Sequence, residues 1–147
     1  MTRPREVERA AQADQVELLI LRDGATLSRI VRTTALSGRG VDRAVMWAGA
    51  LLQAPYREMA AQRGVEPYGV YVAFFAYGSP ASRYGLLAGR RIVEVDGQPT
   101  PDLDSFLAAT RGRRDGDPVR LTTVSWNNFT DVLTLKLDPT YWPAYEI

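Results

Sequence analysis

The side chains that could carry out acid–base chemistry in this chain are carboxylates, hydroxyls and arginines, because its 147 residues include no histidine and no cysteine. Ser-His-Asp hydrolysis requires an imidazole that takes up the serine proton and returns it near neutral pH. The usual zinc sites also draw on histidine or cysteine. The sequence therefore predicts that the chain is not an enzyme by itself, and it predicts no catalytic residue, no metal and no cofactor.

Three carboxylates, those of Asp96, Asp102 and Asp104, form the one acidic cluster that could act as an acid–base pair or bind a divalent cation. Asp96 precedes a glycine and fits a turn. Asp102 and Asp104 fall in the first turn of a predicted helix, where the helix dipole favours negative charge. Backbone structure thus accounts for all three, and an enzyme that uses them is a remote alternative.

Composition narrows the class of partner. A net charge of +1, with 46% hydrophobic and 24% charged residues, favours a folded domain and does not indicate a nucleic-acid or membrane partner. No apolar run approaches the roughly 20 residues of a membrane helix, and the first residues lack the apolar core of a signal peptide. Lys136 is the single lysine and alanine is abundant, which we interpret as favouring a GC-rich bacterial source.

The most informative stretch runs from Tyr77 to Pro99 and reads YGSPASRYGLLAGRRIVEVDGQP. Ser79 can cap a short helix that begins at Pro80, whose missing N–H would have no partner there. Gly85 can end that helix in the left-handed conformation. Residues 92–95 then form a short apolar strand, which ends at an Asp-Gly turn.

The elements around this stretch are predicted from hydrophobic spacing. After the turn, Thr100 can cap a helix that begins at Pro101, and Leu103, Phe106 and Leu107 share one helical face. Before the stretch, a short helix is expected over residues 55–64, and a strand covered on both faces over residues 70–75. The aromatic residues 141–145 are expected to pack onto the domain.

In the stretch from Tyr77 to Pro99 the chain resembles the PDZ domains of HtrA/Deg serine proteases, which carry a Gly-Ser-Pro-Ala, Gly-Leu, Ile-x-x-Val-(Asn/Asp)-Gly-x-Pro series. The likeness covers roughly residues 41–147. It is strongest to the last PDZ module of tandem-PDZ HtrA-like proteins, such as the yeast nuclear HtrA-like protease and its bacterial relatives. Further segments carry it: Trp47–Pro55, Gly69–Val72, Pro101–Phe106 and Leu133–Pro143. The resemblance implies an α+β fold: a PDZ-like, partly open antiparallel β-barrel or sandwich with two short helices and the permuted HtrA-type strand order.

The resemblance also implies a peptide-binding site. PDZ domains add an extended peptide as a strand to a sheet edge, while N–H groups of the preceding loop bind its terminal carboxylate. Residues 47–50 take the place of that loop, and residues 50–53 that of the pairing strand. Trp47 replaces a smaller residue of the family, so it either lines the groove, closes it or belongs to the core. The predicted peptide-binding residues are Trp47, Ala48, Gly49, Ala50, Leu51, Leu52, Leu103, Phe106 and Leu107.

The first part of the chain has the pattern of a separate piece. A helix over residues 5–13, a strand over 15–21, an Arg-Asp-Gly turn and a return strand over 25–36 repeat the order in which HtrA-type PDZ domains end. The alternative is that this part packs on the following domain as extra structure. The predicted organisation is the tail of a preceding PDZ module over 1–36, a linker over 37–40 and a PDZ domain over 41–147.

A partial module would leave an open strand edge at Val16–Leu21, so strand exchange between two copies is a plausible route to a homodimer. The predicted function is a non-catalytic module that recognises C-termini or extended segments, for substrate recruitment or regulation in an HtrA-like protease. Its expected partners are a peptide or protein C-terminus and the protease domain of the parent chain. The periplasm or cell envelope is expected if that parent is bacterial. The alternative is a groove blocked by Trp47 or residues 1–36, in a module that serves oligomer assembly or interdomain regulation.

Overall fold

The computed structural model describes residues 14–33 and 41–147. The chain divides into two compact units, Met1–Gly38 and Arg39–Ile147, and each is described by itself. The helix predicted over residues 5–13 and the linker predicted over 37–40 lie outside the described residues.

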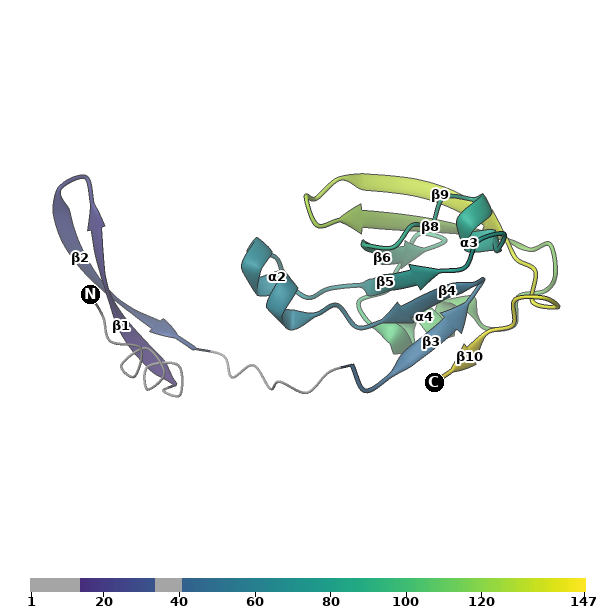
Figure 1. The fold of residues 1–147 in the computed structure, drawn as a ribbon, viewed down its shortest axis with the longest axis horizontal. Coiled ribbons are helices and arrows are strands. Elements are labelled where there is room, and N and C mark those ends of the chain that lie inside the picture. The colour runs from purple at the N-terminus through teal and green to yellow at the C-terminus, as the bar shows by residue number, and fades with distance from the viewer. Residues whose placement is uncertain (1–13, 34–40) are drawn as a thin grey trace. The chain divides into compact units, whose positions relative to one another are not determined.

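The first unit contains an antiparallel hairpin of β1 (Gln15–Arg22) and β2 (Ala25–Arg32), as the sequence predicts (Figure 1). Asp23 and Gly24 form its turn with φ angles of 52° and 76°, the left-handed geometry that joins twisted strands by two residues. The return strand ends at Arg32, and residues 34–36 of the predicted strand lie outside the described residues.

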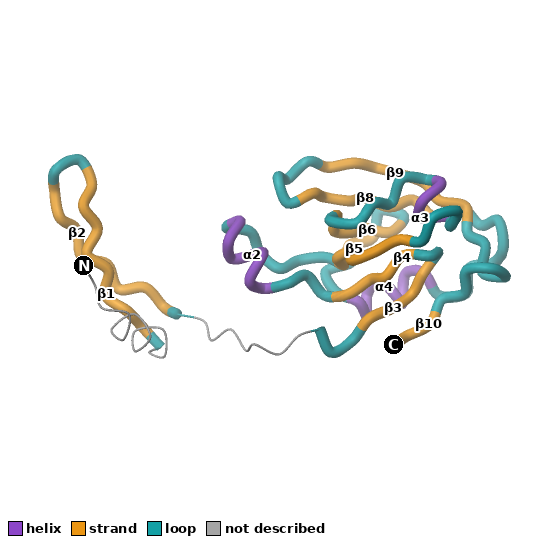
Figure 2. The backbone as a smooth tube through the Cα atoms, in the orientation of Figure 1, coloured by secondary structure: helices purple, strands orange, loops and turns teal. Residues whose placement is uncertain are grey.

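The second unit is an open, antiparallel sheet with short helices (Figure 2). The strand order is β10-β3-β4-β5-β6-β8-β9, and β7 pairs with β6. Three helices are described in this unit, one at each place where the residue pattern predicts a helix, whereas the family resemblance implies two short helices. The strands are β3 (Ala44–Trp47), β4 (Ala50–Gln53), β5 (Val70–Phe75), β6 (Arg90–Val95), β7 (Gln98–Pro99), β8 (Pro118–Ser125), β9 (Thr130–Lys136) and β10 (Tyr145–Glu146), and the helices are α2 (Arg57–Arg63), α3 (Pro80–Arg83) and α4 (Leu103–Thr110).

One hydrophobic core holds this unit together. Alternate residues of the strands point into it, as the two-residue period of a half-buried strand requires. Helix α4 contributes Phe106, and the stretch after α3 contributes Leu86, both fully buried. The largest fully buried apolar side chains are Phe106, Leu52, Leu86, Ile92, Leu121 and Leu135. No helix among the described residues is long and apolar enough to cross a membrane.

The N-terminal cap of α3 is the residue predicted from the sequence, and the N-terminal cap of α4 is a different one. Ser79 caps α3 as predicted: its Oγ accepts the N–H of Ser82 at 3.2 Å, and Pro80 is the first helical residue. At α4 the predicted cap, Thr100, is wrong, because Asp102 is the cap and accepts the N–H of Ser105 at 2.8 Å. The hydroxyl of Ser105 in turn accepts the N–H of Asp102 at 3.2 Å, and this reciprocal box stabilises a start two residues later.

Candidate functional site

A tight turn replaces the predicted peptide-binding loop. Ala48 and Gly49 join β3 to β4 with φ angles of 51° and 80°, and Trp47 pairs with Ala50 across the turn. The carbonyl of Ala48 accepts the N–H of Ala81 at 3.0 Å. A Cβ on Gly49 would lie 2.2 Å from the Cβ of Ser79, so only glycine fits this place.

Residues 50–53, the predicted pairing strand for a ligand, have no free edge in this structure. Strand β4 is enclosed on both edges, by β3 along its full length on one side and by β5 on the other. Strand β3 was not predicted from the sequence, because residues 47–50 were interpreted as a loop and residues 50–53 as the strand that follows it. The free peptide-pairing edge expected on β4 is therefore taken by the chain itself.

The outer edge of β3 pairs with β10, the last strand that the structure describes. The N–H of Ile147 donates to the carbonyl of Ala44 at 2.8 Å, and Tyr145 lies opposite Met46. We call residues 138–147 the closing segment. It forms one end of the sheet, and β9 forms the other.

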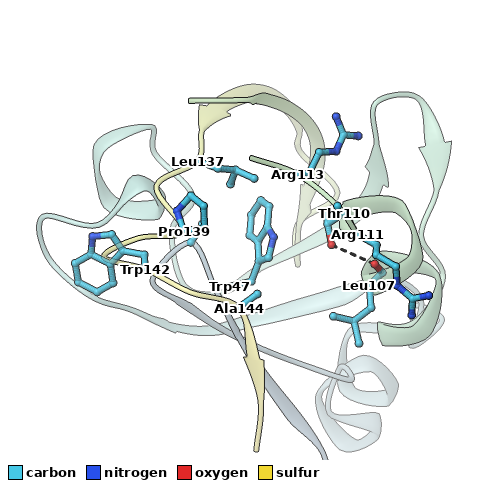
Figure 3. Close-up of a pocket in the computed structure, with 11 residues that line it drawn as sticks. Trp47, Leu107, Thr110, Arg111, Arg113, Leu137, Pro139, Trp142 and Ala144 are labelled. Atoms are coloured by element: carbon cyan, nitrogen blue, oxygen red, sulfur yellow. Dashed lines mark hydrogen bonds between the residues drawn. The ribbon is translucent and has the colours of Figure 1, made fainter. Parts of the chain in front are cut away.

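A cavity of about 290 Å³ lies between the turn, the second half of α4 and the closing segment. Figure 3 shows the ring of Trp47 between residues of the closing segment on one side and residues of α4 on the other. We call this cavity the Trp47 pocket. Its lining residues are Trp47, Ala48, Leu107, Thr110, Arg111, Gly112, Arg113, Leu137, Pro139, Trp142 and Ala144.

Three of the predicted site residues, Trp47, Ala48 and Leu107, line this pocket. Trp47 is also a core residue: it is 3% exposed, and its ring meets that of Phe106 edge to face at a centroid distance of 5.2 Å. Gly49 lies against Trp142, whose Cε3 would be 3.0 Å from an added Cβ. Of the other predicted residues, Leu51 is half-buried outside the lining, and the core contains Ala50, Leu52, Leu103 and Phe106.

Two groups of residues that line the pocket were not predicted from the sequence. One is the end of α4 and the residues after it, from Thr110 to Arg113. The other belongs to Leu137 and the closing segment, whose aromatic residues were expected to pack on the domain but not to form a wall. The aromatic and proline content at 141–145 was the signal that could have indicated this wall.

Charge links the closing segment to α4 through one arginine. Arg43 precedes β3, forms an ion pair with Glu146, and places its Nη1 at 2.7 Å from the Oδ1 of Asp104. The guanidinium of Arg43 lowers the pKa of Glu146 below its ordinary 4.5, and the two carboxylates raise the pKa of Arg43. The pair therefore holds the closing segment while Glu146 is ionised.

The three carboxylates of the predicted acidic cluster, Asp96, Asp102 and Asp104, each have a hydrogen-bond or ion-pair partner within the domain. Asp96 accepts the N–H of Arg120 at 2.9 Å and binds Arg113 at 2.6 Å. Hydrogen bonds from Ser105 lower the pKa of Asp102 in its capping role. In the ranges that the structure describes, no group of three or more histidine, cysteine, aspartate or glutamate side chains could hold a metal.

The family model that matches residues 40–115 is described as PDZ-like domain, and the chain belongs to this family. The chain is 43% identical over 136 residues to Protease Do-like 7 of Arabidopsis thaliana, and it covers 12% of that protein. The match includes 91% of this chain. The chain is 35% identical to the pro-apoptotic serine protease nma111 of Aspergillus clavatus, over 99% of this chain and 14% of that protein.

Solved structures give the same fold. An HtrA-type protease, AlgW with a decapeptide, matches 65% of this chain and 30% of its own length, with a TM-score of 0.54 and 28% identity. The HtrA3 PDZ domain bound to a phage-derived ligand matches 71% of this chain and 92% of its own length, with a TM-score of 0.53 and 20% identity.

The prediction of a PDZ domain of the HtrA/Deg type is thereby confirmed, and the chain corresponds to the PDZ part of these proteases. The chain spans between 12% and 14% of the curated relatives described here. Those relatives come from a plant and a fungus, so the prediction of a bacterial source is not supported.

Proposed function

We propose that this chain is a peptide-binding PDZ module within a longer HtrA-like serine protease, where it recruits substrates or regulates the protease domain. Two structural neighbours are complexes, AlgW with a decapeptide and the HtrA3 PDZ domain with a phage-derived ligand. The sequence match to Protease Do-like 7 supports a protease as the parent chain.

The observation that carries the proposal is the Trp47 pocket beside a short strand edge. Its walls outside the closing segment include the indole of Trp47 and the side chain of Leu107, which suit an apolar side chain of a ligand. Burial of one such side chain stabilises a complex by roughly 1.5–3 kcal/mol. Because β4 is enclosed over its full length, we place ligand pairing on the outer edge of β3, which the two-residue strand β10 covers in this structure.

The test is fluorescence anisotropy with labelled C-terminal and internal peptides against the full chain and two matched variants. Leu107→Arg puts a charge on the pocket wall and should weaken binding by about ten-fold or more, since an apolar contact is lost. Leu87→Arg is the control, because Leu87 is 45% exposed and does not line the pocket. Equal binding by both variants, or no binding by the wild-type chain, would contradict the proposal.

A second candidate function is a module with a blocked groove that acts in oligomer assembly or interdomain regulation. The burial of Trp47 against Phe106 and the enclosure of β4 favour it. In that case no peptide would bind, and the chain would associate with itself or with other parts of the parent protein. Light scattering after size-exclusion chromatography, over a range of concentrations, separates self-association from a monomer.

We further propose that residues 1–36 are the tail of a preceding PDZ module and that residues 37–40 link it to the domain. The exposed apolar side chains of β1 and β2 support this, because an isolated two-stranded hairpin is marginal in water. In a longer fragment of the parent protein, the amides of Gln15–Arg22 should exchange more slowly with solvent than in this chain. Unchanged exchange would contradict it, and protection that rises with concentration would indicate strand exchange between copies instead.

A further inference from the structure

The closing segment occupies the β3 edge in the manner of a bound peptide. Its residues 145–147 lie antiparallel to β3, and Ala144 and Trp142 line the Trp47 pocket. Glu146 forms the ion pair with Arg43, next to Asp104 of α4. The closing segment therefore shows which ligand features fit this edge: an extended backbone, a side chain that faces the Trp47 pocket and a carboxylate that pairs with Arg43.

The attachment of this segment is slight. Strand β10 has two residues, whereas β8 has eight and β9 seven. Tyr145 and Ile147 are 54% and 68% exposed. The ion pair of Arg43 with Glu146 is exposed to solvent, and exposed ion pairs contribute little to stability. A short ladder with these contacts can be displaced by a competing strand.

The segment also fills its site incompletely. Ala144 contributes only a methyl group to a pocket that retains a cavity of about 290 Å³. Residues 144 and 146 are two apart, so in an extended strand they lie on one face. A ligand with a large apolar residue at the position of Ala144 and a carboxylate two residues later would keep the pair with Arg43 and fill the cavity.

The charges around the pocket agree with an acidic ligand. Arg111 and Arg113 line it, and Arg43 lies at the end of the β3 edge. Asp96 pairs with Arg113 and Asp104 pairs with Arg43, whereas no ion pair of Arg111 is found within residues 14–33 and 41–147. Electrostatic complementarity of this kind selects the sign of the partner's charge.

We propose that the β3 edge and the Trp47 pocket bind an extended segment of another protein with a large apolar residue two positions before a carboxylate, and that this segment displaces residues 138–147. The inference rests on the proposed function and specifies its ligand and its competitor. The closing segment lowers the apparent affinity, because only the fraction of molecules with a vacant edge can bind.

The probe is a fluorescein-labelled peptide WPLYEI, which is residues 142–147 with leucine in place of Ala144, and the matched peptide WPLYKI is its control. The wild-type chain should bind WPLYEI at least about three-fold more tightly than WPLYKI. In the full chain, Glu146→Lys weakens the internal competitor and should raise the affinity for WPLYEI about three-fold or more. Glu58→Lys makes the same charge change on α2, outside the pocket lining, and should leave the affinity unchanged.

A second variant tests the competitor without loss of charge. Ala144→Leu lets the closing segment fill its own pocket better and should lower the affinity for WPLYEI about three-fold or more. If Glu146→Lys binds no better than Glu58→Lys and Ala144→Leu binds no worse than wild type, displacement of the segment is overturned. If the general peptide library binds but WPLYEI and WPLYKI bind equally, the ligand chemistry is wrong while the proposed function stands. If nothing binds, including WPLYEI with Glu146→Lys, both fail.

Discussion

The hairpin of β1 and β2 and the hairpin of β8 and β9 are of nearly equal length but differ in burial. In the second unit, β8 and β9 bury Val119, Leu121 and Leu135 in the core. In the first unit, one face of the hairpin carries the apolar residues Val16, Leu18, Ile20, Leu27 and Val31. Val16 is half-buried and the other four are exposed.

Each hairpin has apolar residues at alternate positions on one face, and the first hairpin also places Leu19, Leu21 and Ile30 on its opposite face. What differs is the rest of the sheet: β8 also pairs with β6, whereas β1 and β2 pair only with each other within the described residues. The local residue pattern is therefore sufficient to form a hairpin, whereas burial of its apolar side chains requires a further strand or helix to pack against.

The largest expected difference between the hairpins is in the free energy of unfolding. Leu121→Ala leaves a cavity in the core and should lower that free energy by about 2–5 kcal/mol. Leu18→Ala, the same change on the exposed face of β1, should change it by less than about 0.5 kcal/mol. Urea denaturation of each variant measures both values. Equal losses would break the comparison, since they would mean that β1 is buried in solution.

A smaller contrast is expected at the turns. Gly49→Ala brings its Cβ into Ser79 at 2.2 Å and requires a φ of 80°, so it should cost about 2–4 kcal/mol. Gly24→Ala in the first hairpin has a φ of 76° but no atom within 4 Å of the new Cβ. Its cost should be about 1 kcal/mol of backbone strain, confined to the hairpin. Thermal unfolding followed by circular dichroism gives the first value, and the amide exchange of Gln15–Arg22 gives the second; a Gly49→Ala variant as stable as wild type would contradict the close approach.

The smallest expected effect is a difference in acid sensitivity between the apolar pair of β8 and β9 and the edge strand β10. The pair of β8 and β9 is held by core residues, whereas β10 is held on β3 in part by ionised Glu146. Since the pKa of Glu146 is lowered below 4.5, the stabilisation is complete above pH 4.5 and is lost as the pH falls through the lower value in the folded chain. Amide chemical shifts of Ile147 should therefore change in acid before those of Leu121. Simultaneous change would show that this ion pair does not hold the edge.

The local parts of the fold could be predicted because their information lies within a few residues. Ser79, Pro80 and the turn Asp23-Gly24 take the roles that their own chemistry dictates. The helix α4 shows the limit, because Thr100 and Asp102 are both good caps and only the reciprocal bond with Ser105 decides between them.

The candidate site was harder to predict because its contacts join distant residues. The N–H of Ile147 donates a hydrogen bond to the carbonyl of Ala44, more than 100 residues earlier in the chain, and no local sequence pattern predicts this pairing with β3. Strand β5 was predicted to be covered on both faces, yet Phe74 is 55% exposed. The register shift of β4 between Leu51 and Leu52 lies opposite this part of β5, and such a bulge cannot be derived from spacing alone.

The contact of Trp142 with Gly49 gives the chain an intrinsic optical reporter. The indole of Trp142 lies against the turn glycine, while Trp47 is fixed in the core beside Phe106. Departure of the closing segment would transfer the Trp142 indole to water and leave the surroundings of Trp126, next to Arg91 and Tyr71, unchanged. Tryptophan emission from Trp142 and from Trp47, which line the same pocket, can therefore follow vacancy of the β3 edge in unlabelled protein.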